Sequence, residues 1–484
     1  MASHYKEMNE TNQAKVPIRT KALVFWLAVL VLVAVVSVVG VAWFRVGLQD
    51  SAARVAIDKR LEAIRVAGQP LNMQDLARLY PDPPPSQDAA PLLKPALAQV
   101  VSSKNSTSIP LFGADFPPGN VPFQNSASNE IRVLIDKNQA ALDSVPWEKL
   151  QGTWFGSGFQ NGFTNLTEVP IHNIDTLVEI LCLDAASKAE DQHAKEATQS
   201  LRRALEIGQT LKSDTILHGF AKQAIEKWVC RSMNRVVNRT ILADSDLRAL
   251  SDSLTRTNFG TTKGLLINER AFGLSIAENL HSLAAGSGQT ASFSPVRRFL
   301  KSYQSKLIYR DQDLLDYLDK VEAGFPALDL PLSNSLPMLL ALQQESKKKQ
   351  DALEKKRGSA YLSAFEHHRV SLLSIQTPPS AYSLLTAEAK TVAFVRVTKA
   401  VLAIERWRLS HAGSVPDSLS ALKPEFLSDV PIDPFDEKPL RYKKLGRGYV
   451  VYSIGPDFTD DNGEPEPKGA SHPTHYDVVF QVER

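Results

Sequence analysis

Five oxygen-bearing side chains near the C-terminus are the clearest candidates for chemistry in this sequence. Asp457, Asp460, Asp461 and Asn462 lie in one short acidic run, and Asp477 follows on a predicted strand. Calcium binds about six to eight hard oxygen atoms, which clustered carboxylates and turn carbonyls can supply. The spacing is not that of an EF-hand loop. The alternative interpretation is an acidic solvated turn, which Asp, Asn and Gly residues favour by themselves.

Other residues with chemical potential are dispersed. His472 and His475 follow the acidic run and could provide nitrogen ligands for a transition metal. Glu269 next to Arg270 is either a buried carboxylate with a raised pKa or half of a structural ion pair. No local motif of a serine hydrolase, zinc protease, phosphate-binding loop or dinucleotide site occurs. No catalytic residue is therefore assigned, although an enzyme with dispersed carboxylates would leave no local motif.

The composition is that of an ordinary globular protein with room for more than one domain. The chain has 484 residues, of which 43% are hydrophobic and 22% are charged. The formal net charge of +2 creates no overall field that would favour nucleic acid. Cys182 and Cys230 are far apart in sequence, and they are either two buried thiols or a disulfide between neighbouring helices.

The N-terminal region has the pattern of a membrane anchor. No charged residue occurs from Ala22 to Phe44, and a helix of this length would span roughly 33 Å, enough for a bilayer core of about 30 Å. A cleaved signal peptide is the alternative. Lys15, Arg19 and Lys21 precede the apolar segment, which favours a cytoplasmic N-terminus. These features predict a single-pass protein of the cell membrane with most of its chain outside the cytoplasm.

The remainder divides by periodicity and by proline content. Residues 45–170 are predicted to be a stalk followed by an irregular, Pro-rich region, because proline lacks a backbone donor and interrupts helices. Residues 171–375 contain apolar residues every three to four positions, which indicates a helical bundle or a short solenoid. The predicted domains are the cytoplasmic tail 1–21, the transmembrane helix 22–44, the stalk and irregular region 45–170, the helical domain 171–375 and the C-terminal module 381–484.

The C-terminal module is predicted to be a helix packed on a three-stranded antiparallel sheet. Residues 387–411 have a helical apolar stripe, and residues 440–445 and 449–454 are two strand-like runs around a Gly-Arg-Gly turn. Residues 477–482 offer the third strand. The predicted fold class is thus mainly α, with an N-terminal transmembrane helix, an extracytoplasmic helical bundle or short solenoid, and a small C-terminal α+β module.

The C-terminal module resembles the C-terminal segment of type II secretion major pseudopilins. The resemblance covers roughly residues 388–480, and its ordered elements are Asp433-Pro434-Phe435, Pro439-Leu440-Arg441-Tyr442 and Tyr452-Ser453-Ile454-Gly455-Pro456-Asp457. It implies that the following loop binds calcium through Asp457, Asp460, Asp461, Asn462 and Asp477. No prepilin cleavage motif precedes Ala22, so the usual assembly into a pilus is not implied. The rest of the chain loosely resembles uncharacterised bacterial single-pass membrane-anchored helical proteins.

Two functions from different classes are compatible with these patterns. The first is a scaffold or interaction protein of the cell envelope, attached to the membrane, with an unidentified envelope protein as partner and calcium as its cofactor. The second is an extracytoplasmic hydrolase that uses dispersed carboxylates. A deep pocket with two converging titratable groups would favour the enzyme, whereas a broad apolar groove would favour the scaffold.

Overall fold

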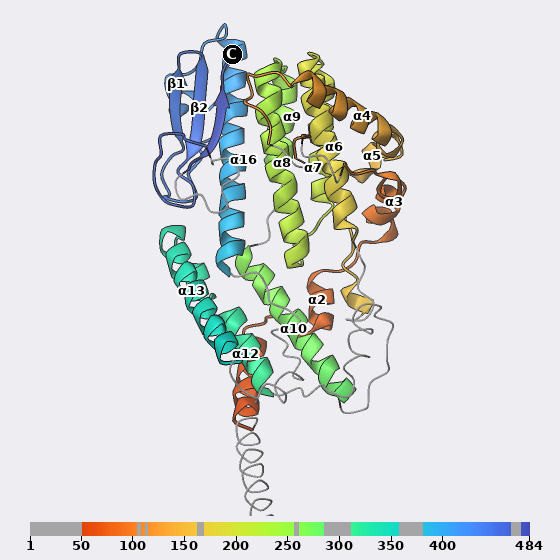
Figure 1. The fold of residues 1–484 in the computed structure, drawn as a ribbon, viewed down its shortest axis with the longest axis vertical. Helices are drawn as coiled ribbons and strands as arrows, with labels where there is room; N and C mark the ends of the chain where they lie inside the picture. Colours follow the sequence, from red (N-terminus) through yellow and green to blue (C-terminus); the bar gives the residue numbers. More distant parts are fainter. Residues whose placement is uncertain are drawn as a thin grey trace, which may run out of the picture.

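The described part of the chain is mainly helical and carries one small sheet. The structure is a computed structural model, and it describes residues 51–103, 108–111, 115–161, 169–255, 261–284, 311–357, 381–465 and 476–484. The helices form an upright bundle with a second, obliquely packed group below it (Figure 1). The sheet lies on one side of the bundle. The predicted predominance of helices, the bundle and the three-stranded antiparallel sheet are therefore confirmed.

The bundle consists of helices that stand side by side, among them α16 near the C-terminus (Figure 1). They are α6 (Ile171–Glu190), α7 (Ala194–Gln209), α8 (Ile216–Arg239), α9 (Asp244–Thr255) and α16 (Ala381–Ser410). The apolar stripe of α7, which includes Leu201 and Leu205, is buried as its spacing predicts. Gly208 lets α7 approach α8, because a Cβ atom there would lie only 2.9 Å from Ile225 Cγ2.

Elements from the first third of the chain cover the side of the bundle opposite the sheet (Figure 1). They are η1 (Pro85–Gln87), α3 (Ala89–Gln99), α4 (Asn125–Asp143) and α5 (Trp147–Leu150). The short helix η2 (Phe159–Asn161) follows them in the chain and packs against α2 (Met73–Leu79). Asp88 caps α3 by accepting a hydrogen bond from the Ala90 amide. The amide of Trp154 donates to the carbonyl of Gln87 at 2.9 Å, which fixes the segment after α5 against the start of α3.

The oblique group below the bundle has its own apolar cluster. Residues 51–66 are helical. The group also contains α2 (Met73–Leu79), α10 (Thr262–Ala284), α12 (Asp311–Glu322), η4 (Ala327–Asp329) and α13 (Leu332–Arg357). Ile57, Leu274, Tyr317 and Leu318 are buried together in this cluster. Tyr317 also donates a hydrogen bond to the carbonyl of Glu269 at 2.9 Å, which joins α12 to α10.

The sheet follows α16 and the short helix η5 (Leu419–Leu422), and it has the strand order β1-β2-β3. The strands are β1 (Arg441–Leu445), β2 (Gly448–Ser453) and β3 (Val478–Val482), and all pairs are antiparallel. The predicted strand positions agree with these bounds within about two residues, the ordinary uncertainty of an element's end. Tyr449 and Val451 of β2 and Phe480 of β3 belong to the same buried cluster as the bundle helices. The sheet and the bundle thus share one hydrophobic core.

The predicted fold class requires one correction, which concerns the transmembrane helix. Among the residues that the structure describes, no helix is both long and apolar enough to cross a membrane. The predicted span, residues 22–44, lies outside the described residues. The long described helices fail the criterion because charged side chains interrupt them. For example, α16 has 30 residues but carries Glu388, Lys390, Arg396, Lys399, Glu405, Arg406 and Arg408.

The two cysteines are separate thiols. Cys182 on α6 and Cys230 on α8 are both free and buried. Burial raises the pKa of each thiol to about 12, so neither is a reactive thiolate at neutral pH. The interpretation as two buried apolar side chains is confirmed.

Candidate functional site

The predicted calcium loop lies over the outer face of the sheet, where Gly463 approaches the Tyr452 ring. The amides of Gly463 and Asp461 donate to the Asp477 carboxylate at 2.6 and 3.4 Å. The amide of Asp477 in turn donates to the carbonyl of Glu464 at 2.7 Å. The structure therefore brings the acidic run and Asp477 together, as the sequence predicts. Backbone hydrogen bonds make this connection.

The other predicted ligands are held by local contacts. Asp457 accepts from the amide of Thr459 at 3.2 Å, and Asp460 accepts from the amide of Asn462 at 3.0 Å. Lys443 of β1 donates to the side-chain oxygen of Asn462 at 2.8 Å. Two basic side chains therefore lie beside the acidic loop, because Arg441 Nε is also 3.7 Å from Asp460 Oδ2.

The electrostatics of the loop leave part of its negative charge uncompensated. Burial raises the pKa of Asp477, and the neighbouring charges of Asp460 and Asp461 raise it further, whereas the amide hydrogen bonds from Gly463 and Asp461 oppose the shift. One oxygen of Asp461, Oδ2, is buried without a hydrogen-bond partner among the described residues. A buried carboxylate oxygen without a donor is destabilising unless a cation or water satisfies it.

The described residues contain no ready-made metal cage. No group of three or more His, Cys, Asp or Glu side chains in this part of the chain is placed to hold a metal ion. His472 and His475 lie outside the described residues. Calcium binding by Asp457, Asp460, Asp461, Asn462 and Asp477 therefore stays a prediction.

A buried carboxylate, Asp433, organises the C-terminal block (residues 381–484). It accepts from the amide of Phe435 at 3.0 Å, from the Ser453 hydroxyl at 2.8 Å and from the amide of Ile454 at 2.8 Å. Arg441 Nη1 also donates to it at 2.7 Å. The ordered sequence elements Asp-Pro-aromatic, Pro-x-Arg-Tyr and Tyr-Ser-Ile-Gly thus converge on one side chain. This role of Asp433 was not predicted from the sequence, although the order of these elements could have indicated it.

A second buried network fastens the sheet to the helices at the far end of α16. Glu405 accepts from the hydroxyl of Tyr449 at 2.7 Å and pairs with Arg408 and Arg484. Burial, together with the Glu405 charge, raises the pKa of Tyr449 well above its usual range. Asn238 of α8 connects to the end of β3, because its side chain accepts from the amide of Glu483 at 2.9 Å.

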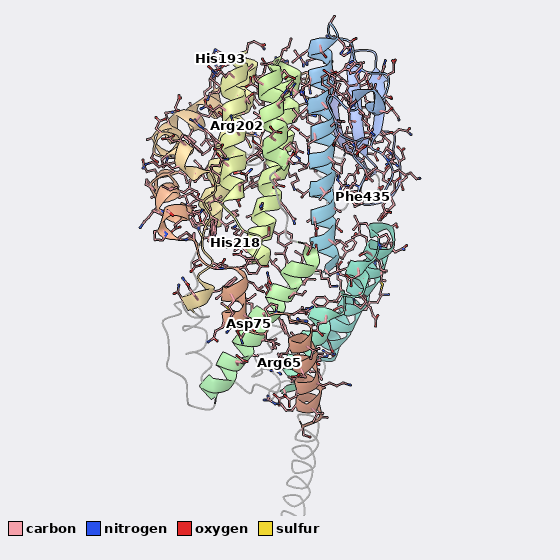
Figure 2. The ribbon with its side chains drawn as sticks, turned by 180° about the vertical axis from the view of Figure 1, so that it is seen from behind. Arg65, Asp75, His193, Arg202, His218 and Phe435 are labelled. Carbon is pink, nitrogen blue, oxygen red and sulfur yellow. The ribbon has the colours of Figure 1, made fainter. Side chains whose placement is uncertain are left out.

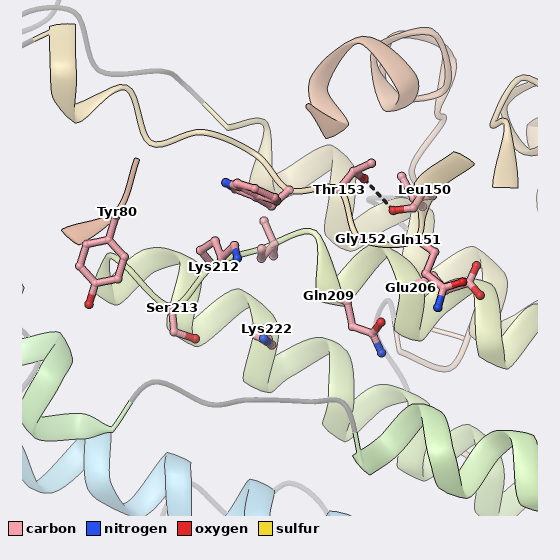
Figure 3. A pocket seen from close by; sticks show the side chains of 12 residues that line it. Tyr80, Leu150, Gln151, Gly152, Thr153, Glu206, Gln209, Lys212, Ser213 and Lys222 are labelled. Atoms are coloured by element: carbon pink, nitrogen blue, oxygen red, sulfur yellow. Dashed lines mark hydrogen bonds between the residues drawn. The ribbon is translucent and has the colours of Figure 1, made fainter. Parts of the chain in front are cut away.

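A cavity of about 520 Å³ opens between the end of α7, the start of α8 and the segment after α5 (Figure 3). Its lining residues are Tyr80, Leu150, Gln151, Gly152, Thr153, Trp154, Glu206, Gln209, Leu211, Lys212, Ser213 and Lys222. Lys212 Nζ lies 4.3 Å from the centre of the Trp154 ring, which is a cation–π contact. Lys222 is almost fully buried, with 7% of its surface exposed. No local sequence motif indicates this cavity, because its lining residues come from distant segments.

Ser157, Asp214 and His218 form a buried polar cluster next to this cavity, at the start of α8, where Figure 2 labels His218. His218 Nδ1 is 2.6 Å from Asp214 Oδ1, and the Ser157 hydroxyl donates to Asp214 Oδ2. In a nucleophilic triad the imidazole lies between the hydroxyl and the carboxylate. Here the carboxylate is in the middle, so the cluster fixes the α7–α8 connection and does not activate the serine.

Three further carboxyl groups have raised pKa values. On α6, burial raises the pKa of Asp175 to about 6, and burial together with Asp175 raises that of Glu179 to about 8. On α10, burial raises the pKa of Glu269 to about 7. Arg270 pairs with Glu322 at 2.8 Å, so the structure favours a half-buried Glu269 with a raised pKa over a Glu269–Arg270 ion pair.

The comparisons with known proteins add no assignment. No protein-family model, no curated protein and no solved structure matches this chain.

Proposed function

We propose that this protein is a scaffold or interaction protein of the cell envelope, and that it presents its C-terminal sheet to an envelope protein. In this proposal the bundle and the sheet act as one rigid unit. The observation that carries it is the position of α16, which packs against α8 and α9 on one side and against β2 and β3 on the other. A sheet that shares its core with a bundle keeps a fixed orientation, as a scaffold requires.

The polar residues of the C-terminal block support this proposal because they mainly hold structure. Asp433 joins the turns that flank the sheet, and Glu405 joins β2 to α16 and to Arg484. Asn238 connects the end of β3 to α8. Each of these groups is buried and has hydrogen-bond partners, which favours a single well-defined arrangement. The sheet therefore cannot reorient without breaking several buried interactions.

We propose that the partner binds at strand β1 of the sheet. This strand lies at the edge of the sheet, and Lys444 and Arg447, next to the β1–β2 turn, are exposed. Charged residues on an edge strand disfavour unspecific pairing with other strands. Lys444 already pairs with Asp417, so the exposed Arg447 is the group that a specific partner with acidic side chains would recognise.

Site-specific photo-cross-linking in the producing cells tests the proposal. A photoreactive residue is placed in the full-length chain at Lys444, at Arg447 or, as a control, at Lys195. Lys195 is exposed on α7 beside His193, which lies on the far side of the bundle from the sheet (Figure 2). We expect one discrete adduct, identical for positions 444 and 447 and absent at 195. The same adducts at all three positions, or none at the sheet, would contradict the proposal.

A further inference from the structure

We propose that the cavity between α7, α8 and the segment after α5 is a binding site for a small organic carboxylate with an aromatic or apolar body. This proposal is independent of the scaffold function, because the cavity lies away from the sheet. Its volume of about 520 Å³ is within the usual range for small-molecule sites, roughly 300 to 1,000 Å³. It is also elongated, with Tyr80 towards one end and Glu206 towards the other (Figure 3).

Two lysines give the cavity its anion-binding character. Lys222 projects from α8 and is 7% exposed, whereas Lys212 is exposed at the rim. Burial lowers the pKa of Lys222, the Glu226 carboxylate on the same helix opposes this shift, and the Lys212 charge lowers the pKa further. A ligand carboxylate beside Lys212 and Lys222 would accept charge-assisted hydrogen bonds from the two ammonium groups.

Aromatic and apolar side chains provide the surface for the body of the ligand. Trp154 and Tyr80 are both partly exposed in the cavity, and Leu150 and Leu211 also line it. Such rings contribute a large apolar area at a small cost in side-chain entropy. Glu206 lines the same cavity, and its negative charge disfavours a ligand with a second anionic group at that end. These features select a monoanion.

Buried hydrogen bonds hold the walls of the cavity in place. Asn268 Nδ2 donates to the hydroxyl of Tyr80 and to the carbonyl of Asp214, both at 2.9 Å. Asp214 follows the lining residue Ser213 and is fixed by His218 and Ser157. The cluster of Ser157, Asp214 and His218 therefore supports the proposal, because it holds one wall of the cavity in a fixed position. Preorganised walls reduce the entropy lost on binding.

Calorimetric titration of the full-length protein with phenylacetate tests the inference, with neutral phenylacetamide as the matched ligand. We expect the acid to bind at least about tenfold more tightly than the amide, because charge-assisted hydrogen bonds are about twice as strong as neutral ones. Lys212→Met and Lys222→Met should each weaken binding of the acid about tenfold, while Lys195→Met should leave it unchanged. Lys212 is exposed, so its variant keeps the fold even if Lys222→Met does not.

Proton uptake gives a second readout that a purely structural lysine would not change. An anion near Lys222 raises its lowered pKa, so binding at alkaline pH should take up protons, and the binding enthalpy should depend on the ionisation enthalpy of the buffer. This dependence should disappear in Lys222→Met. The inference is overturned by equal affinity for acid and amide, by unchanged binding in both cavity variants, or by no binding of phenylacetate up to about 10 mM.

Discussion

Asp433 and Arg441 form an ion pair in which the carboxylate is completely buried: Arg441 Nη1 donates to Asp433 Oδ2 at 2.7 Å, and Asp433 is 0% exposed. Arg441 also binds the carboxylate of Asp436 with both terminal nitrogens. One guanidinium group thus connects the turn before the sheet with strand β1. Because Asp433 also accepts hydrogen bonds from Ser453 and Ile454 at the end of β2, this pair determines how both turns meet the sheet.

Asp433→Ala should therefore strongly destabilise the protein. The substitution removes one of the carboxylates that bind Arg441 and leaves the Ser453 hydroxyl and the Ile454 amide without their acceptor, and each unsatisfied buried donor costs about 1 to 3 kcal/mol. Urea unfolding of the full-length protein measures the loss. The control is Asp429→Ala, because Asp429 pairs with Lys423 but its side chain is 82% exposed. Its expected effect is below about 1 kcal/mol. Equal losses in the two variants would contradict the structural role of Asp433.

Glu269→Gln should change the pH dependence of stability. Burial raises the pKa of the Glu269 carboxyl from 4.5 to about 7 in the folded state, so the folded protein binds this proton more tightly than the unfolded chain does. The stability of the native protein should therefore fall as the pH rises from 4.5 through about 7. The amide of the Glu269→Gln variant stays neutral, so the variant does not lose this stability as the pH rises.

The comparison that tests this prediction is made at two pH values. At about pH 8, Glu269→Gln should be more stable than the native protein by an amount on the order of 2 kcal/mol, and the difference should become small near pH 5. The measurement is thermal unfolding of both proteins in matched buffers. Glu425→Gln, at an exposed position, is the control and should follow the native protein at both pH values. A constant difference between Glu269→Gln and the native protein would show that burial does not shift this group.

The sequence predicted local elements better than the contacts between distant segments. The apolar stripe around Leu201 and Leu205 specifies a helix because its period is that of an α-helix, and the Gly-Arg-Gly turn specifies a hairpin because glycine permits the required backbone angles. Neither pattern contains information about which elements touch. The convergence of Asp433, Arg441 and Ser453 depends on tertiary folding, and so does the meeting of Tyr80 with Lys222 in the cavity.

Trp228→Ala should destabilise the bundle less than a fully buried tryptophan would. Trp228 lies next to the buried residues Ile225 and Val229 on α8, and it is itself half-buried against the main hydrophobic cluster. A fully buried tryptophan costs about 3 to 5 kcal/mol when truncated, so we expect about 2 kcal/mol here. Urea unfolding measures the change. Leu217→Ala on the same helix, where the side chain is 60% exposed, is the control and should cost less than about 0.5 kcal/mol. An unchanged urea midpoint for Trp228→Ala would show that this side chain does not contribute to the hydrophobic core.

Calcium should stabilise the acidic loop at the outer face of the sheet. Burial raises the pKa of Asp477, and the charges of Asp460 and Asp461 raise it further, so these negative charges lie close enough to repel one another. Asp461 Oδ2 is buried without a partner among the described residues, so a cation there would satisfy it. Arg441 and Lys443 of β1 lie beside the loop and reduce its negative potential. The dissociation constant for calcium should therefore be on the order of 10⁻⁴ to 10⁻³ M, as in extracellular modules.

Thermal unfolding of the full-length protein with calcium or with a chelator tests this last prediction. Calcium at a hundred times its dissociation constant should stabilise the native state by about 2.7 kcal/mol, since it binds only the folded loop. The gain should vanish in the double variant Asp460→Ala with Asp461→Ala and persist in Asp429→Ala. It should also shrink as the pH falls, because burial raises the pKa of Asp477, and a protonated Asp477 carboxyl group no longer attracts the cation. Identical melting temperatures of the native protein in calcium and in chelator would contradict calcium binding. The conformation of the loop would then depend only on the amide hydrogen bonds to Asp477 and on its contacts with Arg441 and Lys443.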